Sequence, residues 1–235
     1  MPYRRKRIPE NSIQCRVFKH KPSSGVCCAE RIDAESSQVT GRGGRRILKI
    51  NRLKRTSRNH ENDAEGRLDD LCDEHRAKKF VDSDVDATMA TMVPEPYVYN
   101  VPTMVGGFGG EGVRRFYSEQ FINQIPKDAG VTPISRTMGK DRAVDELIVS
   151  FTHDTQWDYL LPGLPPTGKR VDLPHVVVMK FENGKVAHEH IWWDQASLLV
   201  QVGVLDPTNL PVRGVEQARE LLRIAQSQGL VSAKG

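Results

Sequence analysis

Residues 171–203, VDLPHVVVMKFENGKVAHEHIWWDQASLLVQVG, contain the pattern that decides the fold. Residues 171–181 alternate apolar side chains and one histidine with other residues, which predicts a β-strand with one buried face. Asn183-Gly184 is a strong hairpin-turn signal, so the residues after it should return as an antiparallel strand. Asp194 is a good helix N-cap, and Gly203 has the usual place just after a helix C-terminus. The stretch therefore predicts strand, turn, strand and helix.

Apolar periodicity elsewhere predicts the remaining elements. Strands are expected at 133–139, weakly, and at 146–157, where Leu147, Val149, Phe151, His153 and Trp157 share one face. Helices are expected at 67–81, at 85–92 between the cap Asp84 and the stop Pro94, at 111–124 and at 214–226, and alternating tyrosines predict a strand at 96–104. Consecutive strands with short turns form an antiparallel sheet, and helices grouped on one side of it indicate an α+β fold. We expect a cone-shaped, curved sheet packed with N-terminal helices and enclosing a pocket.

Charge divides the 235 residues into two parts. Residues 1–58 hold 16 of the 34 lysines and arginines but only 4 of the 30 acidic residues. Residues 59–235 are net acidic, so the overall charge of +4 conceals a basic arm on an acidic body. The arm has few large apolar residues to offset an ordering cost of roughly 1–2 kcal/mol per residue. We expect residues 1–58 to be mostly disordered and residues 59–235 to fold as one domain.

The role of the basic arm stays open. Its clusters Arg4–Arg7 and Arg52–Arg55 suit nuclear import or weak contact with nucleic acid, and a solvated tail is the simpler alternative. No nucleic-acid partner is expected except through this arm. We expect a cytoplasmic protein, with nuclear or mitochondrial import as alternatives, because no apolar segment follows Arg4–Arg7 to form a secretory signal. The sequence has no apolar run of about 18 residues that could span a membrane. The cysteines show no disulfide or zinc-site spacing, which favours a reducing intracellular compartment.

A glycine-rich segment, GGFGGEG at 106–112, contains the spacing of a dinucleotide-binding motif. Gly107, Gly109 and Gly112 follow a predicted strand and precede a predicted helix. The chain after them is a meander of strands, with no second parallel strand and no acidic residue placed to hold a ribose. We interpret the segment as a flexible strand-to-helix turn at the rim of a pocket, and we expect no cofactor.

Four segments carry a resemblance to a known family. They are GVRRFYSEQF at 112–121, FTHD at 151–154, LPGLPPTGKRVDLP at 161–174 and FENGKVAHEHIWWDQASLLVQVG at 181–203. Over about residues 67–205 they resemble the SnoaL-like polyketide cyclases of the nuclear-transport-factor-2-like superfamily. The resemblance implies a cone of three helices on a curved sheet with a deep pocket, and a homodimer that forms through the outer sheet face.

The resemblance also implies catalysis by an acidic side chain without metal or cofactor. The cyclases use an aspartate at a strand-to-helix junction as general acid and base, and Asp194 occupies that position here. His153 matches a histidine on the family's long strand. Alternation would place His190 and Trp192 on the face of Asp194, where desolvation would raise the pKa of its carboxyl group. An N-cap role explains Asp194 equally well.

These residues lead to a functional hypothesis. Asp194 would move the proton, and His153 and His190 would orient or polarise a carbonyl oxygen. The side chains expected to bind the substrate are Trp157, Trp192, His175 and Tyr99. The expected function is a cofactor-independent lyase, isomerase or cyclase acting on a polyketide-like or other apolar carbonyl compound. The alternative is a non-catalytic module of the same fold that binds an apolar ligand or a protein partner.

The pair His188 and His190 leaves a metal site open. Side chains two residues apart on a strand lie on one face, so both imidazoles could bind one ion. They could equally serve an acid–base site or be ordinary sheet residues. A protein metal site needs three or more ligands held by supporting hydrogen bonds. We expect no metal.

Overall fold

The computed structural model describes residues 34–35, 52–53 and 63–232. The chain separates into two units, Met1–Glu30 and Arg31–Gly235. The first unit and most of the predicted basic arm lie outside the described residues, so the prediction made for residues 1–58 stays a prediction. In the second unit, β1 (Ala34–Glu35) and β2 (Arg52–Leu53) pair as a short antiparallel ladder.

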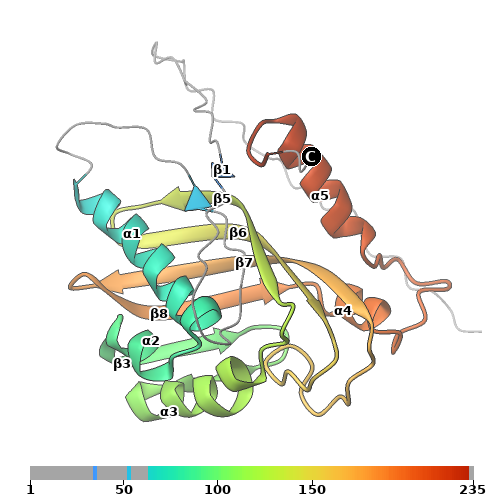
Figure 1. Ribbon diagram of the computed structural model, residues 1–235, viewed down its shortest axis with the longest axis horizontal. Helices are drawn as coiled ribbons and strands as arrows, with labels where there is room; N and C mark the ends of the chain where they lie inside the picture. The colour runs from blue at the N-terminus through green and yellow to red at the C-terminus, as the bar shows by residue number, and fades with distance from the viewer. Residues whose placement is uncertain (1–33, 36–51, 54–62, 233–235) are drawn as a thin grey trace, which may run out of the picture. The chain divides into compact units, whose positions relative to one another are not determined.

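Residues 63–232 form a six-stranded sheet that carries helices on both faces (Figure 1). The strands are β3 (Met92–Asn100), β4 (Val105–Phe108), β5 (Gly130–Met138), β6 (Arg142–Thr152), β7 (Arg170–Glu182) and β8 (Lys185–Trp193). The helices are α1 (Asp63–Ala77) with its π-helical continuation η2 (Lys78–Asp82), α2 (Val85–Ala90), α3 (Gly109–Phe116) with η3 (Tyr117–Phe121) and η4 (Ile122–Gln124), α4 (Gln195–Gln201) and α5 (Glu216–Ser227). The predicted helices and strands therefore form, with shifted ends.

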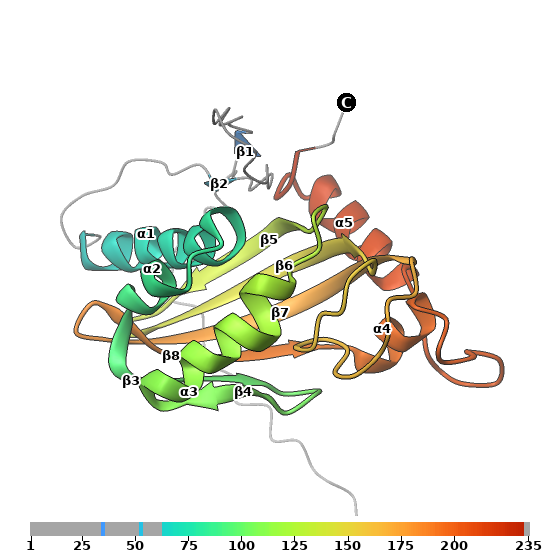
Figure 2. The same ribbon diagram turned by 60° about the horizontal axis from the view of Figure 1, so that its bottom comes forward.

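The strand order in the sheet is β4-β3-β8-β7-β6-β5. β3 and β8 run parallel, and every other neighbouring pair in this sheet is antiparallel. Figure 2 shows α1, α2 and α3 over one face of the curved sheet and α5 over the other. The predicted α+β fold, a curved and mainly antiparallel sheet packed with helices, is confirmed.

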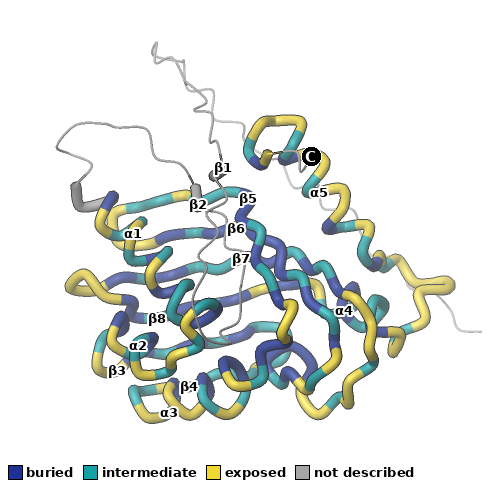
Figure 3. Tube along the Cα trace, viewed as in Figure 1, coloured by how far each residue is buried: buried dark blue, intermediate teal, exposed yellow. Residues whose placement is uncertain are grey.

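The strands alternate between an inner face below α1 and α3 and an outer face. Figure 3 shows this alternation as buried and less buried positions along each strand. On β8 the buried inner residues are Glu189, Ile191 and Trp193, and the less buried outer residues are His188, His190 and Trp192. The main hydrophobic core joins the inner face to helical side chains such as Phe80 and Phe116. On the outer face, α5 packs over Ile134 and Ile148.

Short-range signals set the ends of several elements. Asp84 caps α2 by accepting a hydrogen bond from the backbone N–H of Ala87 at 2.9 Å. Asn183 and Gly184 both have positive φ, 51° and 71°, as a tight hairpin turn requires. Gly203 follows α4 with φ of 79°, in the left-handed region that favours glycine. These three predictions from local sequence are confirmed.

The glycine-rich segment and Pro94 differ from the prediction. The first glycines belong to β4, which pairs with β3, so this part is a strand and not a flexible turn. A Cβ atom on Gly106 would lie 2.0 Å from the carbonyl oxygen of Val98, which explains the need for glycine there. Pro94 does not stop α2, which ends at Ala90, but lies inside β3. The pairing of β3 with β8 shifts register between Met92 and Tyr97, and proline is tolerated at such irregularities.

Candidate active site

A cavity lies between the helices α1, η2 and η3 and the inner face of the sheet. The space measures about 600 Å³ when the part open to solvent is counted, and about 60 Å³ of it can be reached by the centre of a water molecule. Its apolar lining includes Val98, Phe116, Phe121, Val131, Leu147, Val149, Val177, Met179 and Ile191. Polar side chains line it as well, and they are concentrated on α1, η2 and the facing strands.

Glu189 is the centre of a buried polar cluster on one wall of this cavity. Its carboxylate accepts hydrogen bonds from Lys79 Nζ at 2.8 and 3.0 Å, and from the hydroxyl of Tyr117 at 2.9 Å. His75 Nε2 lies 3.3 Å from the same carboxylate. These four residues come from α1, η2, η3 and β8, and each residue is at most 9% exposed. Helix periodicity and strand alternation both point them inward, so they form one desolvated group of acids and bases.

The hydrogen bonds of His75 determine its tautomer. Thr91 donates its hydroxyl proton to the carbonyl oxygen of Thr88 at 2.6 Å, so its oxygen must accept from His75 Nδ1 at 2.6 Å. Burial, and then the nearby Lys79, lowers the pKa of His75 below its ordinary value of 6.5. The neutral ring therefore carries its proton on Nδ1, and Nε2 keeps a lone pair at 3.3 Å from the carboxylate of Glu189. If Nε2 gained a proton, the nearby carboxylate of Glu189 would stabilise the positive charge of the ring.

The other members of the cluster keep complementary protonation states. Burial acts to raise the pKa of Glu189, but the ammonium group of Lys79 outweighs it and holds that pKa well below its usual range. Burial, and then the charge of Glu189, raises the pKa of Tyr117 well above its ordinary value of 10. At neutral pH the cluster thus holds an ionised carboxylate and a neutral phenol. Such separated states beside a neutral imidazole suit proton transfer.

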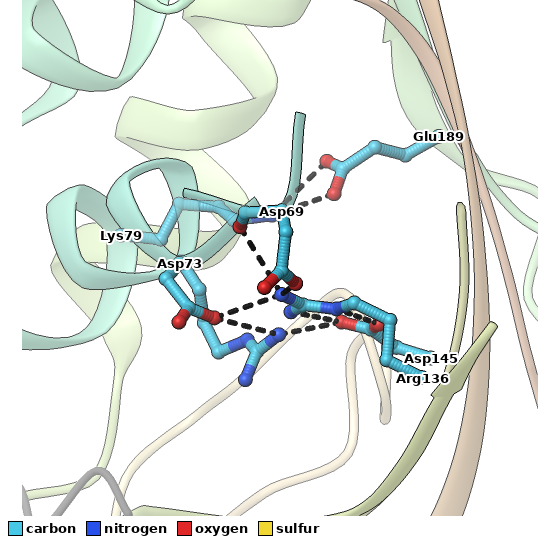
Figure 4. A network of polar contacts seen from close by, with 7 residues as sticks. Asp69, Asp73, Lys79, Arg136, Asp145 and Glu189 are labelled. Carbon is cyan, nitrogen blue, oxygen red and sulfur yellow. Dashed lines mark hydrogen bonds and ion pairs between the residues drawn. The ribbon is translucent and has the colours of Figure 1, made fainter. Parts of the chain in front are cut away.

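A second network of ion pairs joins α1 to β5 and β6 (Figure 4). Arg136 donates to both oxygens of Asp145 at 2.5 and 2.9 Å, and to Asp69 and Asp73 on α1 at 2.6 and 3.0 Å. Arg76 contacts Asp145 at 2.5 Å. Arg76, Asp73, Arg136 and Asp145 each have two or more charged partners, so the evident role of the network is to fix α1 over the sheet.

His175 lies in the cavity wall on β7, away from the Glu189 cluster. It is 4% exposed, and its Nδ1 lies 3.0 Å from the carbonyl oxygen of Leu173. A carbonyl only accepts, so Nδ1 carries the proton and Nε2 has a lone pair. Nε2 is buried without a hydrogen-bond partner. His175 thus brings an unpaired acceptor to the cavity wall.

The comparison with protein families decides the classification. The model of the SnoaL-like polyketide cyclases matches residues 67–202, which is more than half of the chain. The chain belongs to this family. The matched region contains every side chain of the cavity wall described above, so the cavity is part of the SnoaL-like domain.

A solved structure agrees with the SnoaL-like fold. A structure from Jannaschia sp. CCS1 described as a SnoaL-like polyketide cyclase is 17% identical, has a TM-score of 0.53, and aligns over 64% of this chain and 99% of that one. TsrD from Streptomyces laurentii is 20% identical with a TM-score of 0.48, over 60% of this chain and 97% of its own. At 17% identity the likeness to the Jannaschia structure extends to the fold alone. No curated protein matches the chain.

The SnoaL-like domain does not bring the predicted catalytic residues together. His190 points to the outer face of β8, where its Nε2 lies 3.0 Å from the hydroxyl of Tyr97. Asp194 is exposed after β8, where it accepts from the N–H of Ser197 at 3.1 Å and from Gln217 at 2.7 Å. His153 is fully buried beyond the end of β6, beside Thr167, and is not in the cavity wall. The expected convergence is wrong, because alternation on β8 turns Glu189 inward instead of His190.

The predicted substrate-binding residues also divide between different places. Trp192 and Tyr99 are on the outer face, whereas His175 lines the cavity. Trp157 follows β6, which ends at Thr152, so it does not share the strand face assumed for it. It is fully buried in the core instead. Of the residues predicted for the site, His175 alone is in the cavity wall, and its binding role stays a prediction.

The sequence prediction missed His75, Lys79, Tyr117 and Glu189. The signal was available for Glu189, which alternates with Ile191 and Trp193 on a strand whose other face is His188, His190 and Trp192. The sequence alone favours burial of the histidines and tryptophans on this strand and exposure of the glutamate. The helical periodicity of residues 67–81 correctly places His75 on the buried face, but it does not identify Glu189 as its partner across the cavity.

The metal site considered for His188 and His190 can be assessed within the described residues. Among the described residues, no group of three or more histidine, cysteine, aspartate or glutamate side chains could hold a metal ion. His188 and His190 stack with ring centroids 4.9 Å apart, and Tyr97 stacks on His188 at 4.5 Å. The pair is thus part of an aromatic ladder on the outer face. The described helices include none that is long and apolar enough to cross a membrane.

We expect the pH dependence of stability to reveal the neutral His175. Burial lowers the pKa of His175 to about 4, from an ordinary value of 6.5. The unfolded chain takes up this proton below pH 6.5 and the folded chain does not, so stability is complete above that pH and falls below it. The loss should be about 2 kcal/mol between pH 7 and pH 5.

The check is urea unfolding at both pH values for the wild type and for His175→Phe. The variant lacks the titrating ring, so its free energy of unfolding should fall by less over the same interval. An equal fall in both proteins would mean that His175 titrates normally in the folded state.

Asp194 should contribute to stability as a helix cap. Replacing it with alanine removes the acceptor for the N–H of Ser197 and should cost about 1 kcal/mol of unfolding free energy. Asp194→Asn retains a capping oxygen, so its loss of unfolding free energy should be only a few tenths of the loss for alanine. Chemical denaturation of both variants checks the prediction, and equal losses would exclude the capping explanation.

Proposed function

We propose that the cavity around Glu189 is the active site of a cofactor-independent lyase, isomerase or cyclase that acts on an apolar carbonyl compound. The observation that carries the proposal is the buried cluster of His75, Lys79, Tyr117 and Glu189 on the wall of an apolar cavity. Membership of the SnoaL-like family supports polyketide-related chemistry at the level of substrate class.

Energetics support a functional role for the cluster. Burying an ion pair costs several kcal/mol per charge in desolvation, and apolar residues of the same size often give equal or greater stability. Lys79 and Glu189 are nevertheless both buried, and a histidine and a tyrosine are buried with them. Strongly perturbed groups in a cavity are typical of catalytic sites.

In the proposed reaction, His75 Nε2 takes a proton from the carbon next to the substrate carbonyl. The C–H electron pair becomes the enolate π bond, and negative charge moves to the carbonyl oxygen. Glu189, whose carboxylate lies 3.3 Å from Nε2, would stabilise the positive charge of the imidazolium that forms. Lys79 uses two of its three N–H groups on Glu189, which leaves the third for the enolate oxygen.

The product depends on where the electrons of the enolate go next. Return of the proton from His75 to another carbon of the conjugated system gives an isomer. Attack of the enolate carbon on a second carbonyl closes a ring, and the proton from His75 neutralises the new alkoxide. Expulsion of a β-hydroxyl as water, with the proton of His75, gives an unsaturated product. The same residues therefore support each of the three reaction types.

The size of the cavity limits the substrate. A water needs roughly 10–15 Å³ of the volume that its centre can occupy, so 60 Å³ takes only a few waters or a group of similar size. The wider space of about 600 Å³ extends to solvent. A substrate would thus place its reacting carbonyl in the enclosed part, while the rest of its apolar skeleton occupies the wider space.

Exchange of deuterium into a simple ketone tests the proposal without knowledge of the natural substrate. In D2O, the wild type should accelerate loss of the α-proton signal of 1-tetralone above the buffer rate. Lys79→Met/Glu189→Leu replaces the ion pair by apolar side chains of similar size and should abolish the acceleration. Binding of 1-tetralone without exchange would favour the alternative, a non-catalytic ligand-binding module.

We propose in addition that two copies pair through the open half of the outer sheet face. This half carries exposed Trp192 and Phe108, while α5 covers the other half. Lys180 is opposite Arg142 in the register of β7 and β6, and Asp141 forms ion pairs with both side chains. The exposed apolar side chains, and not free charges, therefore carry this proposal. Light scattering should give a dimer for the wild type and a monomer for Trp192→Glu, and a wild-type monomer would overturn the proposal.

A further inference from the structure

The unused acceptor on His175 is the strongest feature of the cavity that the proposed reaction does not employ. The side chain is 4% exposed, lines the cavity, and has no hydrogen-bond partner for Nε2. Leaving a buried polar atom unpaired is costly, so such an atom calls for a reason. A ligand that supplies the missing donor removes this cost, so the site would bind such a ligand in preference to one without a donor.

The tautomer defines what His175 can bind. Its Nδ1–H is directed to the carbonyl oxygen of Leu173, so Nε2 offers only a lone pair. A carboxylate or phosphate would find no donor there and would be repelled. An ammonium group would lose its hydration against an apolar wall, which includes Leu147 and Val149. An uncharged hydroxyl is the partner that fits both the lone pair and the surroundings.

Strand geometry gives the position of this acceptor relative to the Glu189 cluster. Met179 is opposite Glu189 in the pairing of β7 with β8, and His175 is four residues before Met179 on β7. Four residues of a strand span about 13 Å between Cα atoms. Since both side chains line the same cavity, a ligand of two fused rings could reach from one to the other.

The ring environment of His175 favours a flat hydroxylated ligand. The indole of Trp193 lies against the imidazole with ring centroids 5.2 Å apart, and Tyr159 packs edge-on against Trp193 at 5.7 Å. These rings hold the imidazole in one orientation, so Nε2 is a fixed acceptor and not an adaptable one. Fixed polar groups in apolar pockets are what determines ligand orientation.

We infer that His175 forms a hydroxyl-recognition subsite, which selects substrates that carry an uncharged hydroxyl group at the end of the apolar skeleton opposite the reacting carbonyl. The inference rests on the proposed function for the identity of the reacting end, but the binding preference can be measured without catalysis. His175 acts here as a specificity residue, and the proton transfer belongs to His75.

The test is the binding of three related ketones to the full-length wild type by calorimetry at pH 7.5. 6-Hydroxy-1-tetralone should bind about tenfold more tightly than 1-tetralone, the value of one good neutral hydrogen bond. 6-Methoxy-1-tetralone, which has no donor, should show no such gain. Equal affinity of the hydroxy and methoxy compounds, or no binding of either, would overturn the subsite.

A variant locates the preference, and the exchange assay separates the two proposals. His175→Phe keeps a ring against Trp193 and removes the acceptor, so the ratio of hydroxy to methoxy affinity should fall to about one. An unchanged ratio in a folded variant would exclude His175. If the hydroxyl preference is present but no ketone exchanges its α-proton, the subsite stands and the catalytic proposal fails. If exchange occurs without any preference, the reverse holds.

Discussion

Replacing Glu189 by leucine should lower the free energy of unfolding by about 3–5 kcal/mol, because it leaves the ammonium group of Lys79 buried without its counterion. Lys79 donates two hydrogen bonds to that carboxylate, at 2.8 and 3.0 Å. Lys79→Met should cost a similar amount, since it leaves the carboxylate unpaired. Urea unfolding at pH 7 measures both losses.

The double variant Lys79→Met/Glu189→Leu is the informative control. With both charges gone, no buried ion is left unpaired, so the double variant should be more stable than either single variant. It should still be less stable than the wild type, because the hydroxyl of Tyr117 loses its acceptor, at about 1–3 kcal/mol. A double variant as unstable as the sum of the two single losses would mean that the pair is not coupled.

Trp157→Ala should be the most damaging single change in the hydrophobic core. The indole is fully buried, lies edge-on to Phe151 at 4.9 Å, and donates its N–H to the carbonyl oxygen of Phe121 at 3.2 Å. Removal of such a side chain leaves a large cavity and costs about 3–5 kcal/mol. In a domain of this size the melting temperature should fall by roughly 10 °C.

Trp192→Ala is the matched control for the core tryptophan. Trp192 is 38% exposed on the outer face, so Trp192→Ala should lower the free energy of unfolding by much less than Trp157→Ala does. Calorimetric melting of both variants at low protein concentration makes the comparison. Equal losses would contradict the assignment of Trp157 to the core and Trp192 to the surface.

Local signals in the sequence predicted the helices and most of the strands, but not the order of the strands in the sheet. The alternation over 171–181, the turn at Asn183-Gly184 and the cap at Asp194 each follow from neighbouring residues, and the structure contains all three. The parallel pairing of β3 with β8 could not be predicted in this way. It joins segments about 90 residues apart, and nothing in either strand specifies its partner.

The candidate site was predicted less well, for two physical reasons. The face of a strand is set by its register, so an error of one residue exchanges His190 for Glu189. The buried charges of Lys79 and Glu189 are also contrary to the usual expectation that charged residues are solvated. Only a fold that places η2 opposite β8 makes their burial possible, and that contact spans 110 residues of sequence.

The most direct test of the account compares two identical substitutions, His75→Gln and His190→Gln. His75 lines the cavity beside Glu189, whereas His190 is on the outer face next to Tyr97. Deuterium exchange into 1-tetralone, measured by proton NMR on variants shown to be folded, should fall about 10²–10⁴-fold for His75→Gln. It should remain near the wild-type rate for His190→Gln. Loss of exchange in His190→Gln with retention in His75→Gln would place the chemistry on the opposite face of the sheet and contradict the account.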